Sequence, residues 1–222
     1  MAADPDETLA AARETLVRGL RPDISDERVL AAIASVARER FVAAELREVA
    51  YQDRPLQIGH GQTISQPRMI AMMLQELALT GTGKVLEVGT GSGYQTALLA
   101  ELADSVVSVE LIPELAEGAR AVLEELGYAS VRVHIAGEVL GWPDEAPYDA
   151  IIVAAAAPRI PQSLVDQLAA GGRLALPVGS REEQDLLLAQ RLPEGVTIVR
   201  KGPCRFVPLI GPEAYTPAEI AP

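Results

Sequence analysis

The pattern of apolar and polar positions divides the chain into two parts. In the N-terminal part, apolar residues recur at helical spacing over 8–17, 29–37 and 70–77, which predicts three amphipathic helices. Ser25 is expected to cap the second helix, because acidic residues follow it in the first turn. From Lys84 onward, short apolar runs alternate with helical stretches. This alternation predicts a parallel sheet with helices on both of its faces.

Five apolar runs are the candidate parallel strands, at 84–88, 105–109, 131–135, 149–153 and 173–178, with helices at 94–103, 113–126 and 161–169. The C-terminal rhythm differs and indicates a β-hairpin within 186–199 and a short strand at 206–209. We therefore predict one integrated α/β domain. Residues 1–80 form its helical N-terminal extension, and residues 81–222 form its Rossmann-like core.

The first predicted strand runs into three alternating glycines, Gly89, Gly91 and Gly93, and then into a helix. Doubly wound α/β domains build nucleoside pockets in this way, because glycine lets the backbone turn sharply and approach a ligand. Glu110, about twenty positions after the first glycine, is placed to accept hydrogen bonds from ribose hydroxyls. A dinucleotide fingerprint requires glycine where Tyr94 stands. The observed spacing resembles motif I of S-adenosylmethionine-dependent methyltransferases; a tight turn without a ligand is the alternative.

A second motif, residues 61–67, lies directly before the third predicted helix and contains the hydroxyls of Thr63 and Ser65. A helix start carries free N–H groups and partial positive charge, so these hydroxyls are suited to hold a carboxylate without a basic side chain. The local sequence is equally compatible with one hydroxyl simply capping the helix.

The 61–67 motif resembles the signature of protein-L-isoaspartate O-methyltransferases, and the resemblance covers roughly residues 8–212. Further segments match that family in the same order: 51–56, 85–96, 141–143, 146–151, 171–174, 177–179 and 205–209. The resemblance implies an enzyme that transfers a methyl group from S-adenosylmethionine to the α-carboxylate of L-isoaspartyl residues in damaged proteins and peptides. The ester then closes to a succinimide, which partly hydrolyses to normal aspartate. It also implies that the last two strands of the sheet are exchanged relative to most methyltransferases.

The resemblance assigns a cofactor site for S-adenosylmethionine, and for its product S-adenosylhomocysteine. The expected residues are Gly89, Thr90, Gly91, Ser92, Glu110, Leu111, Glu138 and Val139. The family usually has Gly-Asp-Gly where this chain has Gly137-Glu138-Val139. Valine adds bulk beside the adenine and excludes backbone conformations open to glycine, so this departure bears on cofactor affinity.

The resemblance also places the substrate. Ser65, together with Thr63, is expected to position the substrate carboxylate and to be the catalytic pair. His60, Phe206 and Val207 are expected to contact the peptide. A carboxylate has a pKa near 4 and is already an anionic nucleophile at neutral pH, so no general base is required. Neutral hydroxyl donors align it without the strong ion pair that would blunt its reactivity.

Composition narrows the classes of ligand, metal site and cellular location that remain. The net charge of −12 disfavours nucleic acid and anionic membranes. One cysteine and two histidines make a metal site improbable, so we expect none. With no apolar signal segment and no apolar run near the roughly 18 residues of a membrane span, we expect a cytoplasmic protein. We also expect a monomer. Two alternatives stay open: a related carboxyl methyltransferase for another peptide, and a non-catalytic cofactor-binding module.

Overall fold

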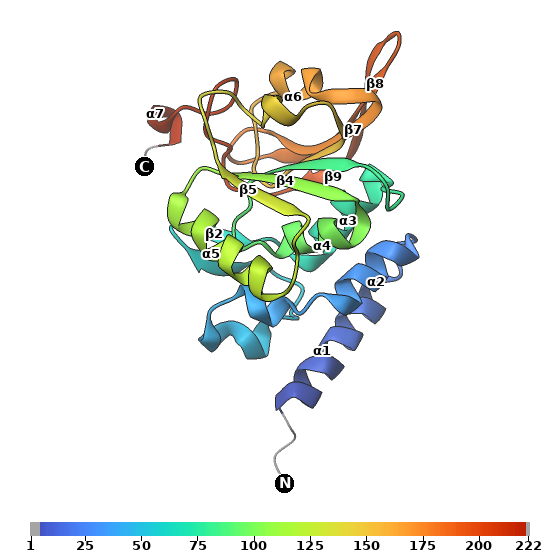
Figure 1. Ribbon diagram of the computed structural model, residues 1–222, viewed down its shortest axis with the longest axis vertical. Helices are drawn as coiled ribbons and strands as arrows, with labels where there is room; N and C mark the ends of the chain where they lie inside the picture. Colours follow the sequence, from blue (N-terminus) through green and yellow to red (C-terminus); the bar gives the residue numbers. More distant parts are fainter. Residues whose placement is uncertain (1–4, 221–222) are drawn as a thin grey trace.

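A seven-stranded sheet forms the centre of the computed structural model, which describes residues 5–220 (Figure 1). The strand order is β5-β4-β3-β6-β7-β8-β9. The strands are β3 (Lys84–Val88), β4 (Ser105–Glu110), β5 (Val131–Ile135), β6 (Tyr148–Val153), β7 (Leu168–Gly179), β8 (Gln184–Leu192) and β9 (Gly195–Cys204). Strands β3 to β7 pair in parallel, whereas β8 and β9 are antiparallel. At this edge β8 lies beside β7, and β9 lies outermost, so the last two strands follow chain order. This agrees with the predicted exchange of these two strands relative to most methyltransferases.

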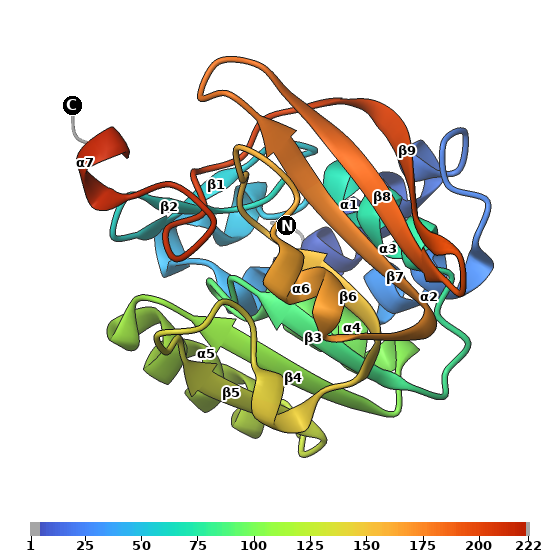
Figure 2. The ribbon, with the colours of Figure 1, turned by 90° about the horizontal axis from the view of Figure 1, so that it is seen from above.

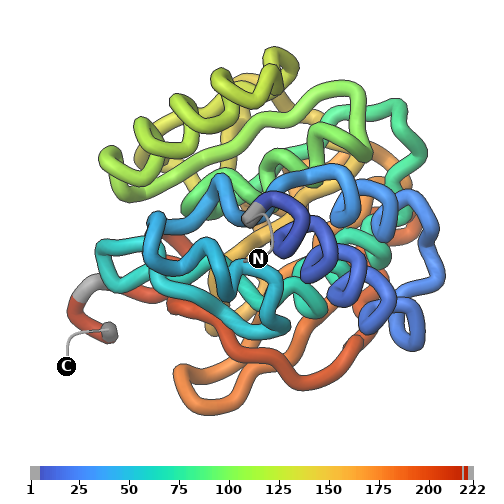
Figure 3. The backbone as a smooth tube through the Cα atoms, turned by 90° about the horizontal axis from the view of Figure 1, so that it is seen from below, coloured from blue at the N-terminus to red at the C-terminus, as the bar shows by residue number. Residues whose placement is uncertain are grey.

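Helices cover both faces of this sheet. On one face lie α3 (Pro67–Leu77), α4 (Tyr94–Leu102) and α5 (Pro113–Glu125), with α2 (Glu27–Ser35) packed on α3 and α4, and α1 (Pro5–Leu20) packed on α2. Figure 3 shows α1 and α2 on the outer side of this layer. On the other face α6 (Gln162–Asp166) packs on β7. The remaining short elements are η1 (Arg38–Phe41), η2 (Ala44–Val49), β1 (Leu56–Gly59), β2 (Gln62–Ile64), η3 (Pro143–Glu145) and α7 (Pro217–Ile220).

Successive residues of the central strands are buried on opposite faces. Val85 and Val106 pack with the helical layer, while Leu86 and Val107 pack in a second cluster with Leu164 of α6. Both faces of a parallel sheet must be covered, so its strands are apolar at consecutive positions rather than at alternate ones. The first cluster also contains buried residues of α1 and α2. The N-terminal helices and one face of the sheet therefore share a single hydrophobic cluster.

Two helix predictions were wrong in detail. The side chain of Asp26, and not that of Ser25, caps α2, by accepting the Arg28 N–H at 2.9 Å. Ser25 instead donates its N–H to the side chain of Gln75, at 2.7 Å, and so ties α2 to α3. The predicted helix at 161–169 ends early, because Leu168 already pairs with β6 as part of β7.

The predicted short strand at 206–209 is also wrong. Pro208 makes a single isolated bridge to Ala156, and no strand forms there within the described residues. Proline has no N–H to continue a ladder. Residues 47–66, for which the sequence shows no helical or strand periodicity, contain the end of η2 and the β1–β2 hairpin. Among residues 5–220, no helix has the length and apolar character needed to cross a bilayer.

Candidate active site

A cavity of about 260 Å³ opens where β3, β4 and β6 end. The chain passes from β3 to β4 on one side and returns to β6 on the other, so the strand order reverses at this point. Ligands of open α/β sheets bind at such a reversal, because the loops leaving neighbouring strands part and leave a crevice. The glycine-rich loop and Glu110, which the sequence singles out, both line this cavity.

The glycine loop has the backbone that only glycine adopts readily. The φ angles of Gly89, Gly91 and Gly93 are 98°, 55° and 89°. A Cβ on Gly89 would lie 3.3 Å from the Cβ of Ala154, and one on Gly91 would lie 3.3 Å from the side chain of Ile58. The left-handed conformation and the close neighbours together explain the glycines. The loop therefore presents bare backbone to the cavity, as a cofactor cradle requires.

Glu110 ends β4 and is buried, with 7% of its surface exposed. One carboxylate oxygen accepts the Gly91 N–H at 2.8 Å, and the other accepts the Ile112 N–H at 3.0 Å. These bonds fix the carboxylate against the glycine loop. A carboxylate has about four acceptor positions, so Glu110 retains capacity for two hydroxyls of a ribose in the cavity. The residues present thus fit a nucleoside cofactor.

A buried carboxylate also supports the glycine loop from behind. Glu87 on β3 has no exposed surface and accepts hydrogen bonds from Gln95, Thr96 and Ser108. The Ser108 hydroxyl is in turn hydrogen-bonded to that of Thr90, in the loop. Burial raises the pKa of Glu87 to about 7, although the three donors oppose this shift. The network joins β3, β4, α4 and the loop.

Thr63 and Ser65 line the same cavity from a second part of the chain, in and just after β2. Within the part of the chain that the structure describes, neither hydroxyl makes a hydrogen bond to another residue, so neither caps α3. One backbone donor at the start of α3 is already used, because Asp53 accepts the Arg68 N–H at 2.9 Å. The two hydroxyls line the cavity and are available as donors to an anion here.

The C-terminal tail closes the cavity from a third side. Val207 and Leu209 bracket Ala156, since the Ala156 N–H donates to the Val207 carbonyl and the Leu209 N–H donates to the Ala156 carbonyl, each at 2.8 Å. Residues 207–212 line the cavity, together with Ile58 of β1. Figure 2 shows the chain after β9 running beside the β1–β2 hairpin. Sequence periodicity contains no signal for this arrangement.

Most of the predicted site residues line this one cavity. They are Thr63, Ser65, Gly89, Thr90, Gly91, Ser92, Glu110, Leu111, Val139 and Val207. Three predicted residues do not line it. His60 is exposed at the tip of the β1–β2 hairpin, Glu138 is exposed, and Phe206 packs against the core, with its backbone bonded to the side chain of Gln184.

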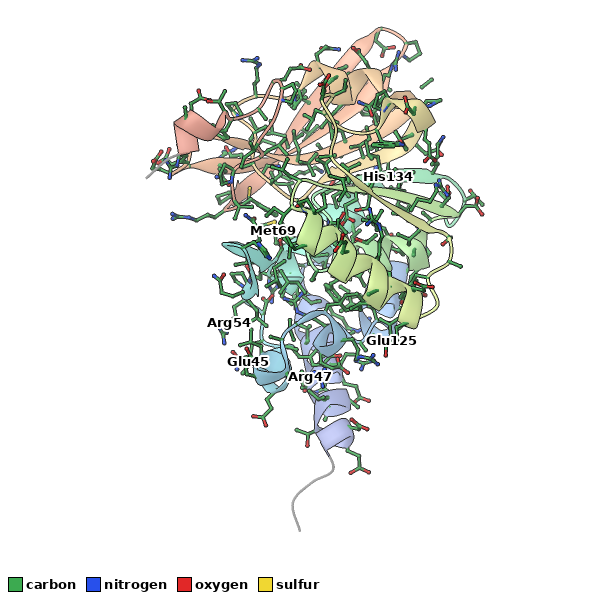
Figure 4. The ribbon with its side chains drawn as sticks, turned by 60° about the vertical axis from the view of Figure 1, so that its left-hand side comes forward. Glu45, Arg47, Arg54, Met69, Glu125 and His134 are labelled. Carbon is green, nitrogen blue, oxygen red and sulfur yellow. The ribbon has the colours of Figure 1, made fainter. Side chains whose placement is uncertain are left out.

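Other chemically suggestive residues have structural partners. His134, labelled in Figure 4, lies on β5, where its ring stacks on Trp142 at 4.0 Å. Arg68 forms ion pairs with Asp53 and Asp23. Burial raises the pKa of the Cys204 thiol to about 11, so it is not a thiolate at neutral pH. Within residues 5–220, no three His, Cys, Asp or Glu side chains are grouped for a metal ion.

The sheet order, the glycine loop and the acid ending β4 together define the class of S-adenosylmethionine-dependent methyltransferases. Comparison with known proteins narrows this class. Residues 11–214 match the family model of protein-L-isoaspartate(D-aspartate) O-methyltransferase. The chain belongs to this family.

Individual relatives are similar over most of their length. The chain is 54% identical over 188 residues to protein-L-isoaspartate O-methyltransferase 1 of Syntrophobacter fumaroxidans, covering 85% of this chain and 88% of that one. It is 53% identical over 200 residues to the Methanoculleus marisnigri enzyme, covering 90% of each chain. Among solved structures, a Plasmodium falciparum protein assigned to the same enzyme class, in complex with S-adenosyl-L-homocysteine, is 27% identical with a TM-score of 0.76, covering 88% of this chain and 96% of that one.

Proposed function

We propose that this protein transfers a methyl group from S-adenosylmethionine to the α-carboxylate of L-isoaspartyl residues in damaged proteins and peptides. The observation that carries the proposal is the placement of two uncommitted hydroxyls, Thr63 and Ser65, in the same cavity as the glycine loop and Glu110. Family membership supports the same reaction. When bound, the cofactor supplies an electrophilic methyl carbon on a sulfonium.

The chain's own residues bind and align the reactants. The backbone of Gly89 to Ser92 and the carboxylate of Glu110 hold the cofactor. Leu111 and Val139, which are 49% and 51% exposed at the cavity, offer apolar contact to its adenine. Ser65 and Thr63 donate to the substrate carboxylate and aim one oxygen at the methyl carbon. Because that carboxylate is already ionised, the residues need only orient it and exclude water.

The exposed residues extend the site toward the protein substrate. Val207 and the tail that follows it provide an apolar wall of the cavity that Thr63 also lines. His60 and Phe206 lie outside the cavity lining, so any contact they make is with the flanking peptide and not with the reacting carboxylate. Glu138 is exposed and is not among the residues that line the cavity, so the cofactor contacts named above do not include it.

The test is transfer of a labelled methyl group to an isoaspartyl peptide and to the same peptide with normal aspartate. We expect base-labile label on the isoaspartyl form and background on the aspartyl form. Binding of S-adenosylhomocysteine without transfer to either peptide would indicate that the protein is a non-catalytic cofactor-binding module. Transfer that prefers another modified peptide would indicate the related carboxyl methyltransferase.

The proposal includes a monomeric enzyme that works in the cytoplasm without nucleic acid. The net charge of −12 supports the last point, because phosphate binding relies on basic patches. Analytical ultracentrifugation is the direct test of the first. We expect a species of 23.5 kDa, and a stable species of twice that mass would refute the monomer.

A further inference from the structure

Arg38 of η1 is fully buried, with none of its surface exposed. Burying a guanidinium is costly unless its donors are used. Nε donates to the Ala50 carbonyl at 2.8 Å, and Nη2 donates to the Ser65 carbonyl at 2.9 Å. The guanidinium carbon lies 4.8 Å from the centre of the Tyr94 ring. One side chain of the N-terminal extension thus contacts both the substrate side and the cofactor side of the cavity.

The two groups that Arg38 contacts belong to the two halves of the site, one for the substrate and one for the cofactor. Ser65 carries the hydroxyl proposed to hold the substrate carboxylate. Tyr94 is the first residue of α4, directly after the glycine loop, and it lines the cavity. Arg38 itself is not a lining residue. It can therefore affect the reaction only through the groups that it holds.

The guanidinium also has no acidic partner among the described residues, since it takes part in none of their ion pairs. Its Nη1 and the Tyr94 hydroxyl are both buried without a hydrogen-bond partner among these residues. Burial accordingly lowers the pKa of Arg38. Buried charged side chains in proteins are normally paired with an opposite charge. What this one does hold is the peptide plane that follows Ser65.

We propose that Arg38 is a positioning residue: its guanidinium bonds the Ser65 carbonyl, packs over the Tyr94 ring and so sets the separation between the substrate-binding hydroxyls and the cofactor loop. The proposal rests on the function proposed above. A planar fork with rigid geometry suits this role, because it holds two carbonyls at once and stacks on an aromatic face. Misplacing a reacting group by about 1 Å can cost about a hundredfold in rate.

The experiment compares Arg38→Gln with the matched control Arg13→Gln. Arg13 also sits over a tyrosine ring, at 5.4 Å from Tyr51, and donates to a backbone carbonyl, but it lies away from the cavity. We expect Arg38→Gln to lower kcat on the isoaspartyl peptide at least about thirtyfold, with the Kd for S-adenosylhomocysteine within about threefold. Arg13→Gln is expected to lower Tm and to leave kcat within about threefold.

A double-mutant cycle separates positioning from general damage. If Arg38 acts through Ser65, Arg38→Gln costs little further rate in a Ser65→Ala background, whereas independent effects multiply. Multiplying losses, or a kcat for Arg38→Gln within threefold of wild type, would overturn the proposal. Should the glutamine variant not fold, Arg38→Lys carries the same test, because lysine keeps the charge but cannot bridge both carbonyls.

Amide hydrogen exchange tests the role of Arg38 without measuring turnover, so this inference can fail or hold independently of the proposed function. Arg38→Gln is expected to speed amide hydrogen exchange in residues 62–66, and Arg13→Gln is not. Wild-type protein that fails to methylate the isoaspartyl peptide would refute the proposed function. Unchanged exchange in residues 62–66 would refute the positioning role of Arg38, whatever the substrate.

Discussion

The buried carboxylate of Glu87 makes the stability of this protein depend on pH in an unusual direction. Its pKa rises from 4.5 in the unfolded chain to about 7 in the native state, mainly because of burial. Between these values the native state keeps a proton that the unfolded state has lost. Glu87 therefore contributes stability that is fully present below pH 4.5 and lost as the pH rises through 7. Most structural carboxylates have lowered pKa values, and they contribute stability that is lost as the pH falls.

Replacing Glu87 with Gln removes this titration. The full effect is about 3 kcal/mol, since each pKa unit corresponds to about 1.4 kcal/mol. The protein has an isoelectric point near 4.7, where solubility is poor, so the practical window starts higher. Between pH 5.5 and pH 7.5 the contribution of Glu87 to the free energy of unfolding falls by about 2 kcal/mol. We expect the free energy of unfolding of Glu87→Gln, taken relative to that of wild type, to increase by that amount as the pH rises across this window, because only wild type loses the Glu87 contribution.

Urea unfolding of both proteins at intervals of pH measures this difference directly. The absolute stability of the variant does not matter, because only its change with pH reports the proton. The exposed Glu124→Gln on α5 serves as the control, with a difference from wild type that stays constant. A Glu87→Gln difference that varies by less than about 0.5 kcal/mol between pH 5.5 and pH 7.5 would show that Glu87 ionises alike in both states, contrary to the reasoning from burial.

Three further predictions concern the cavity. Ser65→Ala is expected to lower kcat about a hundredfold while the Kd for S-adenosylhomocysteine changes less than threefold, measured by label transfer and calorimetry; equal losses in both would mark a structural role. Gly89→Ala forces a left-handed alanine 3.3 Å from the side chain of Ala154 and is expected to weaken S-adenosylhomocysteine binding more than about tenfold, so near-native calorimetry would contradict the cradle. Val139→Gly removes apolar surface at the cavity mouth and is expected to weaken the same binding about fivefold; tighter binding would show instead that Val139 crowds the adenine.

The sequence alone was sufficient for the features that depend on neighbouring residues. The strand that leads into Gly89, the alternating glycines and the acid at the end of β4 are local patterns, and the structure places them where the spacing predicted. Strand and helix periodicity predicted the parallel core for the same reason, since burial on both faces leaves consecutive apolar positions. The resemblance to a known family added the strand exchange and brought Thr63 and Ser65 into the candidate site.

Tertiary structure decided which of these residues share one cavity. Arg38 reaches the Ser65 carbonyl across 27 positions, and the tail at Val207 closes on Ala156 across about fifty, so neither contact leaves a periodic trace in the chain. The exposure of Glu138 and the inward packing of Phe206 likewise depend on side-chain direction, which loop sequence does not encode. Short-range order follows from backbone preference and patterning. A site assembled from segments that are distant in the chain follows only from the packing that brings them together.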